Sequence, residues 1–187
     1  MWWSCCKKNE VKNRQKVLIR IGMFCYNGIV IRKVDFKFME EYKLTMRSED
    51  DTIGLAQNIE SEKFPNMVIC LYGDLGSGKT VFAKAFGSAM GIDGVTSSTF
   101  NIIKEYNGEL PLYHMDVYRV DNNVESLGIE EYFDKGGVTI IEWADLIKDY
   151  LPEERLDIKF RVVDENTRVL VLKPHGEEYE RICEEII

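Results

Sequence analysis

The sequence predicts an α/β domain in which helices cover both faces of a mixed β-sheet, which makes a three-layer sandwich. The apolar run from Met67 to Tyr72 has the length of a strand that is buried on both faces. A glycine-rich turn follows, and the segment from Lys79 to Met90 then has the pattern of a helix. Two pairs of strand-like segments are joined by turn residues, so antiparallel hairpins are expected beside the parallel strands.

The elements before the glycine-rich turn have clear signals. The alternation from Tyr42 to Met46 predicts a short strand. Ser48, followed by three acidic residues, is typical of a helix start, because a side-chain oxygen and negative charge both stabilise that end. This helix is expected to turn four side chains inward, those of Ile53, Leu55, Ala56 and Ile59. The helix after the turn is expected to end at Gly91.

The second half of the chain contains the hairpins. Strands are predicted from Phe100 to Tyr106 and from Leu112 to Asp116, joined through Asn107-Gly108, a dipeptide typical of hairpin turns. The segment from Val138 to Glu142 predicts another buried strand. The other predicted elements are a short helix from Asn123 to Ile129, a helix from Ala144 to Leu151, a hairpin of Leu156 to Val163 and Arg168 to Lys173, and a terminal helix from Glu177 to Ile187.

Charge divides the chain into two parts. Residues 1–38 carry nine Lys or Arg and two Asp or Glu, a net of +7, whereas residues 39–187 carry fifteen and thirty, a net of −15. We therefore predict a basic N-terminal extension over 1–38 and one globular domain over 39–187. Two interpretations of the extension stay open. It is either a basic arm that contacts RNA, an acidic partner or a membrane surface, or a poorly ordered tail translated from upstream of a true start at Met39.

The composition argues against several classes of protein. A net charge of −8 argues against a general nucleic-acid binder, DNA included. The five cysteines have neither the spacing of metal ligands nor that of a disulfide framework. The apolar stretch from Val17 to Ile31 is interrupted by Arg20 and falls short of the about 20 residues of a membrane span. We expect a cytoplasmic protein with no membrane partner.

The strongest motif is Gly73-x-x-x-x-Gly78-Lys79-Thr80, the complete pattern of a phosphate-binding loop between a strand and a helix. Glycines allow the backbone to curl so that several N–H groups point at phosphate oxygens, and the helix start adds positive charge. The lysine can reach the β- and γ-phosphates, and the threonine hydroxyl suits Mg²⁺. The sandwich is therefore predicted to be P-loop NTPase-like.

Hydrolysis also needs acidic groups near the phosphates, and two stand at strand ends. Asp116 and Glu142 each follow an apolar strand, and the carboxyl ends of strands in open α/β sheets meet at the ligand site. Which of the two binds metal and which orients water stays open. His114 is expected on the opposite strand face from Asp116, in a structural role, and Trp143 as a core or rim aromatic. The hydroxyl-rich segment from Thr96 to Phe100 is either a switch-like loop or a polar turn.

Four segments resemble a known family, in the same order and with the same spacing: Gly73 to Thr80, Thr96 to Phe100, Asp116 to Arg119, and Ile141 to Ala144. This is TsaE, also called YjeE, the ATPase of bacterial tRNA threonylcarbamoyladenosine synthesis. The resemblance covers about residues 40–175. Two features depart from the family. Ser98 stands where the family usually has proline, and residues 1–38 have no counterpart.

The resemblance implies a role and a set of site residues. The family binds ATP and Mg²⁺, hydrolyses ATP slowly, and acts with the TsaD and TsaB proteins, which modify adenosine 37 of tRNAs that read ANN codons; tRNA contact is then indirect. Catalysis is assigned to Glu142 and Lys79, and metal binding to Thr80, Asp116 and Glu142. The residues expected to contact the nucleotide are Asp74, Leu75, Gly76, Ser77, Gly78, Lys79, Thr80 and Thr99.

Three alternative functions compete with an ATPase on the sequence. A small-molecule kinase needs an arginine-rich lid, but the arginines after residue 119 are scattered singly. A GTPase is disfavoured because the sequence has no Asn-Lys-x-Asp motif. A non-catalytic nucleotide switch would bind ATP only to dock a partner, and Glu142 is the residue that distinguishes it from an ATPase.

Overall fold

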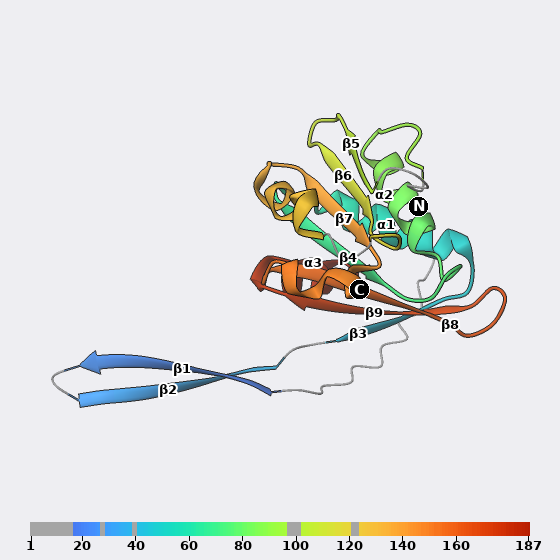
Figure 1. The fold of residues 1–187 in the computed structure, drawn as a ribbon. Coiled ribbons are helices and arrows are strands. Elements are labelled where there is room, and N and C mark those ends of the chain that lie inside the picture. Colours follow the sequence, from blue (N-terminus) through green and yellow to red (C-terminus); the bar gives the residue numbers. More distant parts are fainter. Residues whose placement is uncertain (1–16, 27–28, 39–40, 97–101, 121–123) are drawn as a thin grey trace, which may run out of the picture.

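The computed structural model describes residues 17–26, 29–38, 41–96, 102–120 and 124–187 (Figure 1). Its centre is a seven-stranded sheet. The strands lie in the order β3 (Tyr42–Met46), β9 (Arg168–His175), β8 (Arg155–Val162), β4 (Met67–Tyr72), β7 (Val138–Glu142), β6 (Leu112–Asp116) and β5 (Ile103–Tyr106).

The sheet is mixed, as predicted. The four central strands β8, β4, β7 and β6 are parallel, whereas β3–β9, β9–β8 and β6–β5 are antiparallel pairs. The strand β4 lies between two parallel neighbours, and five of its six residues are buried. This explains its unbroken apolar sequence, because both of its faces are covered.

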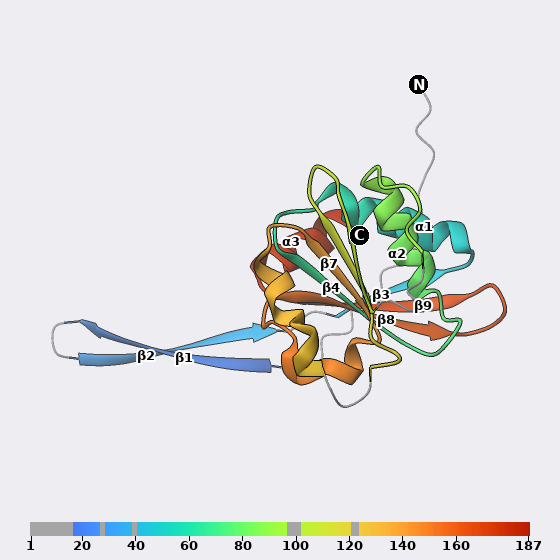
Figure 2. The ribbon, with the colours of Figure 1, turned by 45° about the horizontal axis from the view of Figure 1, so that its top comes forward.

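Helical elements lie on both faces, so the predicted three-layer arrangement is confirmed (Figure 2). One face carries the α-helices α1 (Glu49–Ser61), α2 (Lys79–Ala89) and α3 (Glu177–Ile186). The other carries the 3₁₀ helices η1 (Val124–Leu127), η2 (Ile129–Asp134) and η3 (Ala144–Tyr150). The sequence analysis predicted η3 as one α-helix, but its backbone leaves helical geometry at Ile147 (φ −127°).

The helix α1 begins as the sequence predicts. The Ser48 hydroxyl accepts a hydrogen bond from the backbone N–H of Asp51 at 3.1 Å, and the first turn is acidic. Its apolar stripe packs into the core, with Ala56 and Ile59 fully buried and Leu55 6% exposed. Helix α3 is joined to the sheet by the Tyr179 hydroxyl, which accepts a hydrogen bond from the Val68 N–H at 2.8 Å.

Some boundaries differ from the sequence prediction. The hairpin of β5 and β6 has the predicted inner ends, Tyr106 and Leu112, but β5 begins at Ile103, whereas the predicted start at Phe100 lies outside the described residues. The strand β9 continues past Lys173 to His175. No helix among the described residues is long and apolar enough to cross a membrane.

The structure also contains a two-stranded antiparallel sheet before the domain, formed by β1 (Val17–Tyr26) and β2 (Ile29–Phe38). The sequence analysis predicted no regular element there. A signal was present in the sequence, because Asn27-Gly28 between the two strands is a dipeptide typical of a two-residue hairpin. The interpretation of 1–38 as a separate basic extension stays a prediction.

Candidate nucleotide site

The site is built on the loop that leaves the carboxyl end of β4. Three of its glycines have positive φ, namely Gly73 (138°), Gly76 (75°) and Gly78 (108°), a region that other residues rarely adopt. At Gly73 a side chain is also excluded by space, because a Cβ would lie 2.6 Å from the carbonyl oxygen of Phe160. The loop therefore takes its curl from glycine, as a phosphate cradle requires.

Lys79 lies inside this loop and is only 4% exposed. Its Nζ donates hydrogen bonds to the carbonyl oxygens of Gly73 at 2.8 Å and Asp74 at 2.9 Å. The same Nζ lies 3.7 Å from the centroid of the Trp143 ring, a cation–π contact. Burial lowers the pKa of Lys79, while the negative charges of Glu142 and Asp116 act in the opposite direction. The site thus holds a buried amino group among carboxylates and loop carbonyls.

Thr80 and Glu142 meet beside the lysine. The Thr80 hydroxyl donates a hydrogen bond to Glu142 Oε2 at 2.7 Å. Glu142 is the last residue of β7 and is 2% exposed. A hydroxyl and a carboxylate are oxygen donors of the kind that Mg²⁺ takes in phosphate sites, so this pair fits the ion that the P-loop motif implies.

His114 is the partner that the sequence analysis misplaced. Residues two apart on a strand share a face, so His114 and Asp116 point to the same side, and the expectation of opposite faces was wrong. His114 is fully buried, and its Nε2 lies 2.9 Å from Glu142 Oε1. Its Nδ1 has no hydrogen-bond partner among the described residues. Both oxygens of Glu142 are therefore held, one by His114 and one by Thr80.

Asp116 ends β6 directly beside Glu142, its register partner on β7. Its Oδ1 accepts a hydrogen bond from the Tyr118 N–H at 3.2 Å. Burial raises the pKa of Asp116, the Tyr118 hydrogen bond lowers it, and the neighbouring charge of Glu142 raises it further. Two neighbouring carboxylates, Glu142 buried and Asp116 half-buried, make a site that favours a cation.

A cavity of about 470 Å³ joins these groups. Its wall includes Gly76 to Val81 on one side and Asp116, Tyr118, Arg119, Glu142 and Trp143 on the other. Trp143 has φ 63° and ψ 38°, a left-handed conformation that costs a bulky residue about 1–3 kcal/mol. This backbone turn follows Glu142 directly, and the ring contacts both Lys79 and Tyr118, whose ring centroid is 4.6 Å away. The strained backbone of Trp143 thus lies between the carboxylate of Glu142 and the ring that covers Lys79.

Comparison with known proteins identifies the family. The model of the threonylcarbamoyl adenosine biosynthesis protein TsaE matches residues 46–170. The tRNA threonylcarbamoyladenosine biosynthesis protein TsaE of Bacillus subtilis is 43% identical over 150 residues, which cover 79% of this chain and 95% of the relative. The chain belongs to the TsaE family. The corresponding protein of Treponema pallidum is 37% identical over 114 residues, covering 56% of this chain and 80% of the relative.

The fold agrees with this membership. The crystal structure of Bacillus subtilis YdiB superposes with a TM-score of 0.69 at 40% identity, over 80% of this chain and 96% of that one. As a TsaE protein, the chain is involved in tRNA threonylcarbamoyladenosine biosynthesis. The P-loop-type α/β sandwich predicted from the sequence is confirmed.

Most of the predicted site residues come together in this TsaE structure. Leu75 lines the cavity and is 79% exposed, whereas Asp74 contributes its carbonyl oxygen to Lys79 and Ser77. Thr99 and Ser98 lie outside the described residues, so the switch-like loop stays a prediction. The sequence analysis missed the contact of His114 with Glu142, although the i, i+2 spacing from Asp116 was the available signal.

A second cavity, of about 150 Å³, adjoins the first across the P-loop. Gly76, Gly78 and Val81 line both cavities. Its outer wall comes from the start of α1, with Thr52, and from the turn between β8 and β9, with Asn166 and Arg168. Nothing in the sequence pattern points to it, because its walls come from three separate segments, of which the last, Glu165 to Arg168, follows the P-loop by more than 80 residues.

Proposed function

We propose that this TsaE chain is a Mg²⁺-dependent ATPase that acts with the TsaD and TsaB proteins in the cytoplasm. The pair would transfer a threonylcarbamoyl group to adenosine 37 of tRNAs that read ANN codons. The observation that carries the ATPase proposal is the hydrogen bond from Thr80 to Glu142 beside buried Lys79, within one cavity. This arrangement brings the P-loop, the amino group of Lys79 and the carboxylate of Glu142 together, and these are the groups that a γ-phosphate needs around it.

The roles follow from the geometry. The loop N–H groups and Lys79 bind the β- and γ-phosphates. To do so, Lys79 gives up its hydrogen bonds to the carbonyl oxygens of Gly73 and Asp74 and donates to phosphate oxygens instead. Thr80 and Glu142 hold the ion, which when bound neutralises developing charge on the phosphate oxygens. Asp116, next to Glu142 and less buried, orients water at the open side of the cavity. His114 keeps the Glu142 carboxylate in position.

The position of the second cavity indicates on which side of the P-loop the nucleoside part of a bound nucleotide would lie. Asp116 and Glu142 lie on the β7 side of the P-loop, and the second cavity lies on the β8 side. A nucleotide with its γ-phosphate at Glu142 would therefore extend its ribose and base toward Thr52 and Asn166. The small, polar second cavity and the larger first one together suit a nucleoside and a triphosphate.

The test is phosphate release from ATP by the full chain, with and without Mg²⁺ and with and without the TsaD–TsaB pair. We expect slow turnover alone, because no second protein supplies an arginine to the cavity, and a rise in rate with the pair. ATP binding with no turnover in either condition would instead identify a nucleotide switch. Transfer of phosphate to an added nucleoside would identify a kinase.

A further inference from the structure

One face of the sheet is basic although the domain as a whole is acidic. In the strands β3, β8 and β9, alternate residues such as Leu156, Ile158 and Leu172 pack into the core beneath α1 and α3. The intervening residues point to the other side, where η2 and η3 pack against β7 and β4 instead. We call this outer side the basic face; its residues are Lys43, Thr45, Arg155, Asp157, Lys159, Arg161, Val169, Val171, Lys173 and His175.

The cations on the basic face are adjacent in space. Val171 is paired with Lys43 on one side and Lys159 on the other, so the three side chains form one row. Arg161 is two residues from Lys159 along β8, about 7 Å by strand geometry. Lys43, Lys159 and Arg161 are exposed, and Lys173 is half-buried. Five of the fifteen Lys and Arg residues of 39–187 belong to this face, against one of the thirty Asp and Glu.

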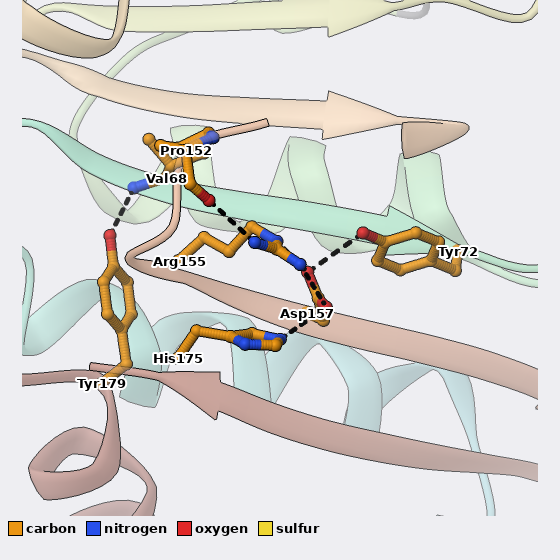
Figure 3. Close-up of polar contacts among 7 residues, drawn as sticks. All are labelled: Val68, Tyr72, Pro152, Arg155, Asp157, His175 and Tyr179. Carbon is orange, nitrogen blue, oxygen red and sulfur yellow. Dashed lines mark hydrogen bonds and ion pairs between the residues drawn. The ribbon is translucent and has the colours of Figure 1, made fainter. Parts of the chain in front are cut away.

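The single carboxylate of the basic face, Asp157, is already neutralised (Figure 3). Arg155 Nε donates to its Oδ1 at 2.9 Å, and His175 Nε2 lies 2.8 Å from its Oδ2. The Tyr72 hydroxyl adds a third hydrogen bond at 3.0 Å. Within the described part of the chain, Lys43, Lys159, Arg161 and Lys173 have no hydrogen-bond or ion-pair partner. These four side chains therefore make no ion pair within the part of the domain that the structure describes.

The chemistry of this surface favours a phosphate backbone over a protein. Protein interfaces centre on exposed apolar or aromatic anchors and are depleted in lysine. An exposed apolar side chain, that of Val163, stands only at the edge of the basic face, two residues after Arg161 and past the end of β8, and Val171 within the face is 9% exposed. The aromatic side chain that adjoins it, Tyr72 opposite Lys159, is half-buried and has its hydroxyl bound to Asp157, so the face suits a structured backbone rather than stacking of unpaired bases.

We propose that the basic face binds the phosphate backbone of structured RNA directly, through Lys43, Lys159, Arg161 and Lys173. The choice of RNA rests on the proposed function, in which the chain works on a tRNA pathway. The acidic remainder of the domain repels a polyanion, so the contact is confined to this face and depends strongly on salt. This differs from the indirect tRNA contact expected from the family resemblance.

The test is the affinity of the full chain for a labelled tRNA transcript, measured by fluorescence anisotropy at several salt concentrations. Binding is expected to weaken with salt. The logarithm of the association constant should fall with the logarithm of the salt concentration, with a slope of about −0.9 for each phosphate contact. The double variant Lys159→Glu and Arg161→Glu should lose at least about tenfold in affinity and reduce the slope by about two. The single variant Lys159→Glu is matched by Lys84→Glu, an exposed and unpaired lysine on α2, which should leave binding unchanged.

The other outcomes overturn the proposal. No binding of the transcript at low salt would exclude direct RNA contact, and equal affinity for duplex DNA of the same length would reduce it to general polyanion binding. Loss of TsaD–TsaB binding in the double variant, with no tRNA binding, would identify an acidic protein as the occupant. ATP hydrolysis is measured on the same samples: if it is absent from the wild type, the proposed function fails while the RNA measurement stands.

Discussion

At the scale of single residues, Glu142 organises the site. It receives hydrogen bonds from Thr80 on α2 and from His114 on β6, and it lies beside Asp116. The P-loop motif and the strand ends mark Thr80, Asp116 and Glu142 in the sequence, whereas only the register of β6 with β7 brings His114 to them. Strand ends predicted Asp116 and Glu142 as candidates, but the contacts separate their environments: Glu142 is almost fully buried and Asp116 is not.

Replacing Lys79 by alanine should abolish function with little loss of fold. The lost charged hydrogen bonds to phosphate should weaken ATP binding by about ten- to a hundredfold. Removing a buried charge relieves its desolvation, which offsets the lost bonds to Gly73 and Asp74. Calorimetric titration gives the affinity and a thermal melt without nucleotide gives the stability. Lys84→Ala in the same helix is the control, and a fall in Tm of more than about 10 °C for Lys79→Ala would contradict the expectation.

Replacing Glu142 by glutamine should separate binding from turnover. Glutamine keeps the shape and can still pair with Thr80 and His114, but it lacks the negative charge. We expect ATP affinity within a few-fold of wild type and hydrolysis slower by at least about a hundredfold, measured as phosphate release. Asp145→Asn, an exposed carboxylate in η3, should change neither. If Glu142→Gln also loses ATP binding, the charge of Glu142 is needed to bind the nucleotide together with its ion, and the expected separation of binding from turnover is wrong.

Replacing Asp116 by asparagine should stabilise the nucleotide-free protein. Burial and the Glu142 charge raise the pKa of Asp116 above its ordinary value of 3.8, so the folded state holds the proton more tightly than the unfolded one. Stability is therefore lost as pH rises through the folded pKa, and neutral asparagine avoids this loss. Melting curves should show a higher Tm for Asp116→Asn at pH 7 and no difference well below pH 3.8. A lower Tm at pH 7 would contradict this sign.

At the scale of elements, some helices are determined by local sequence signals and others by tertiary packing. The start of α1 follows from Ser48 and the acidic turn, which act within a few residues. The 3₁₀ form of η3 does not follow from its local sequence, because that sequence suits an α-helix. The position of η3 is set by its packing on β4. Elements with capping residues were thus predicted well, and elements that adapt to a neighbour were not.

Replacing Ser48 by alanine should destabilise the domain through α1. The N-cap hydrogen bond to Asp51 would be lost, at a cost of about 1 kcal/mol, or about 2–4 °C in Tm for a domain of this size. Ser88→Ala, an exposed serine in α2 whose side chain caps no helix, is the matched control and should stay within about 0.5 kcal/mol of wild type. Equal Tm values for the two variants would show that the cap contributes nothing.

At the scale of the whole molecule, the candidate nucleotide site and the basic face lie at different places on the sheet. The carboxyl edge of β4, β7 and β6 holds the candidate nucleotide site, while the outer side of β3, β8 and β9 holds the basic face. The strand β4 lies next to both, because Tyr72 donates to Asp157 and is followed directly by Gly73 of the P-loop. The part of the chain that matches the TsaE model starts at residue 46, beyond β1 and β2.

Removing residues 1–38 should leave ATP hydrolysis and partner binding intact. The described site and both cavities use residues from 49 onward, and the core of the seven-stranded sheet begins at Tyr42. Phosphate release and a pull-down with TsaD and TsaB, with and without ATP, should give the same results for 39–187 as for the full chain. Loss of either activity would assign the basic extension a working role.

By itself, the sequence determined the P-loop, the strand β4 and the start of α1, because each depends on residues that are adjacent in the chain, and it determined the family through the order and spacing of four motifs. Glycine spacing and a capping serine act locally, so their structural effect can be inferred without the fold. The tertiary structure alone decided that His114 and Thr80 hold Glu142, that Trp143 covers Lys79, and that four cations converge on one face of an acidic domain. These contacts join strands and helices distant in the chain, and their register is set by burial of the apolar face rather than by any local motif.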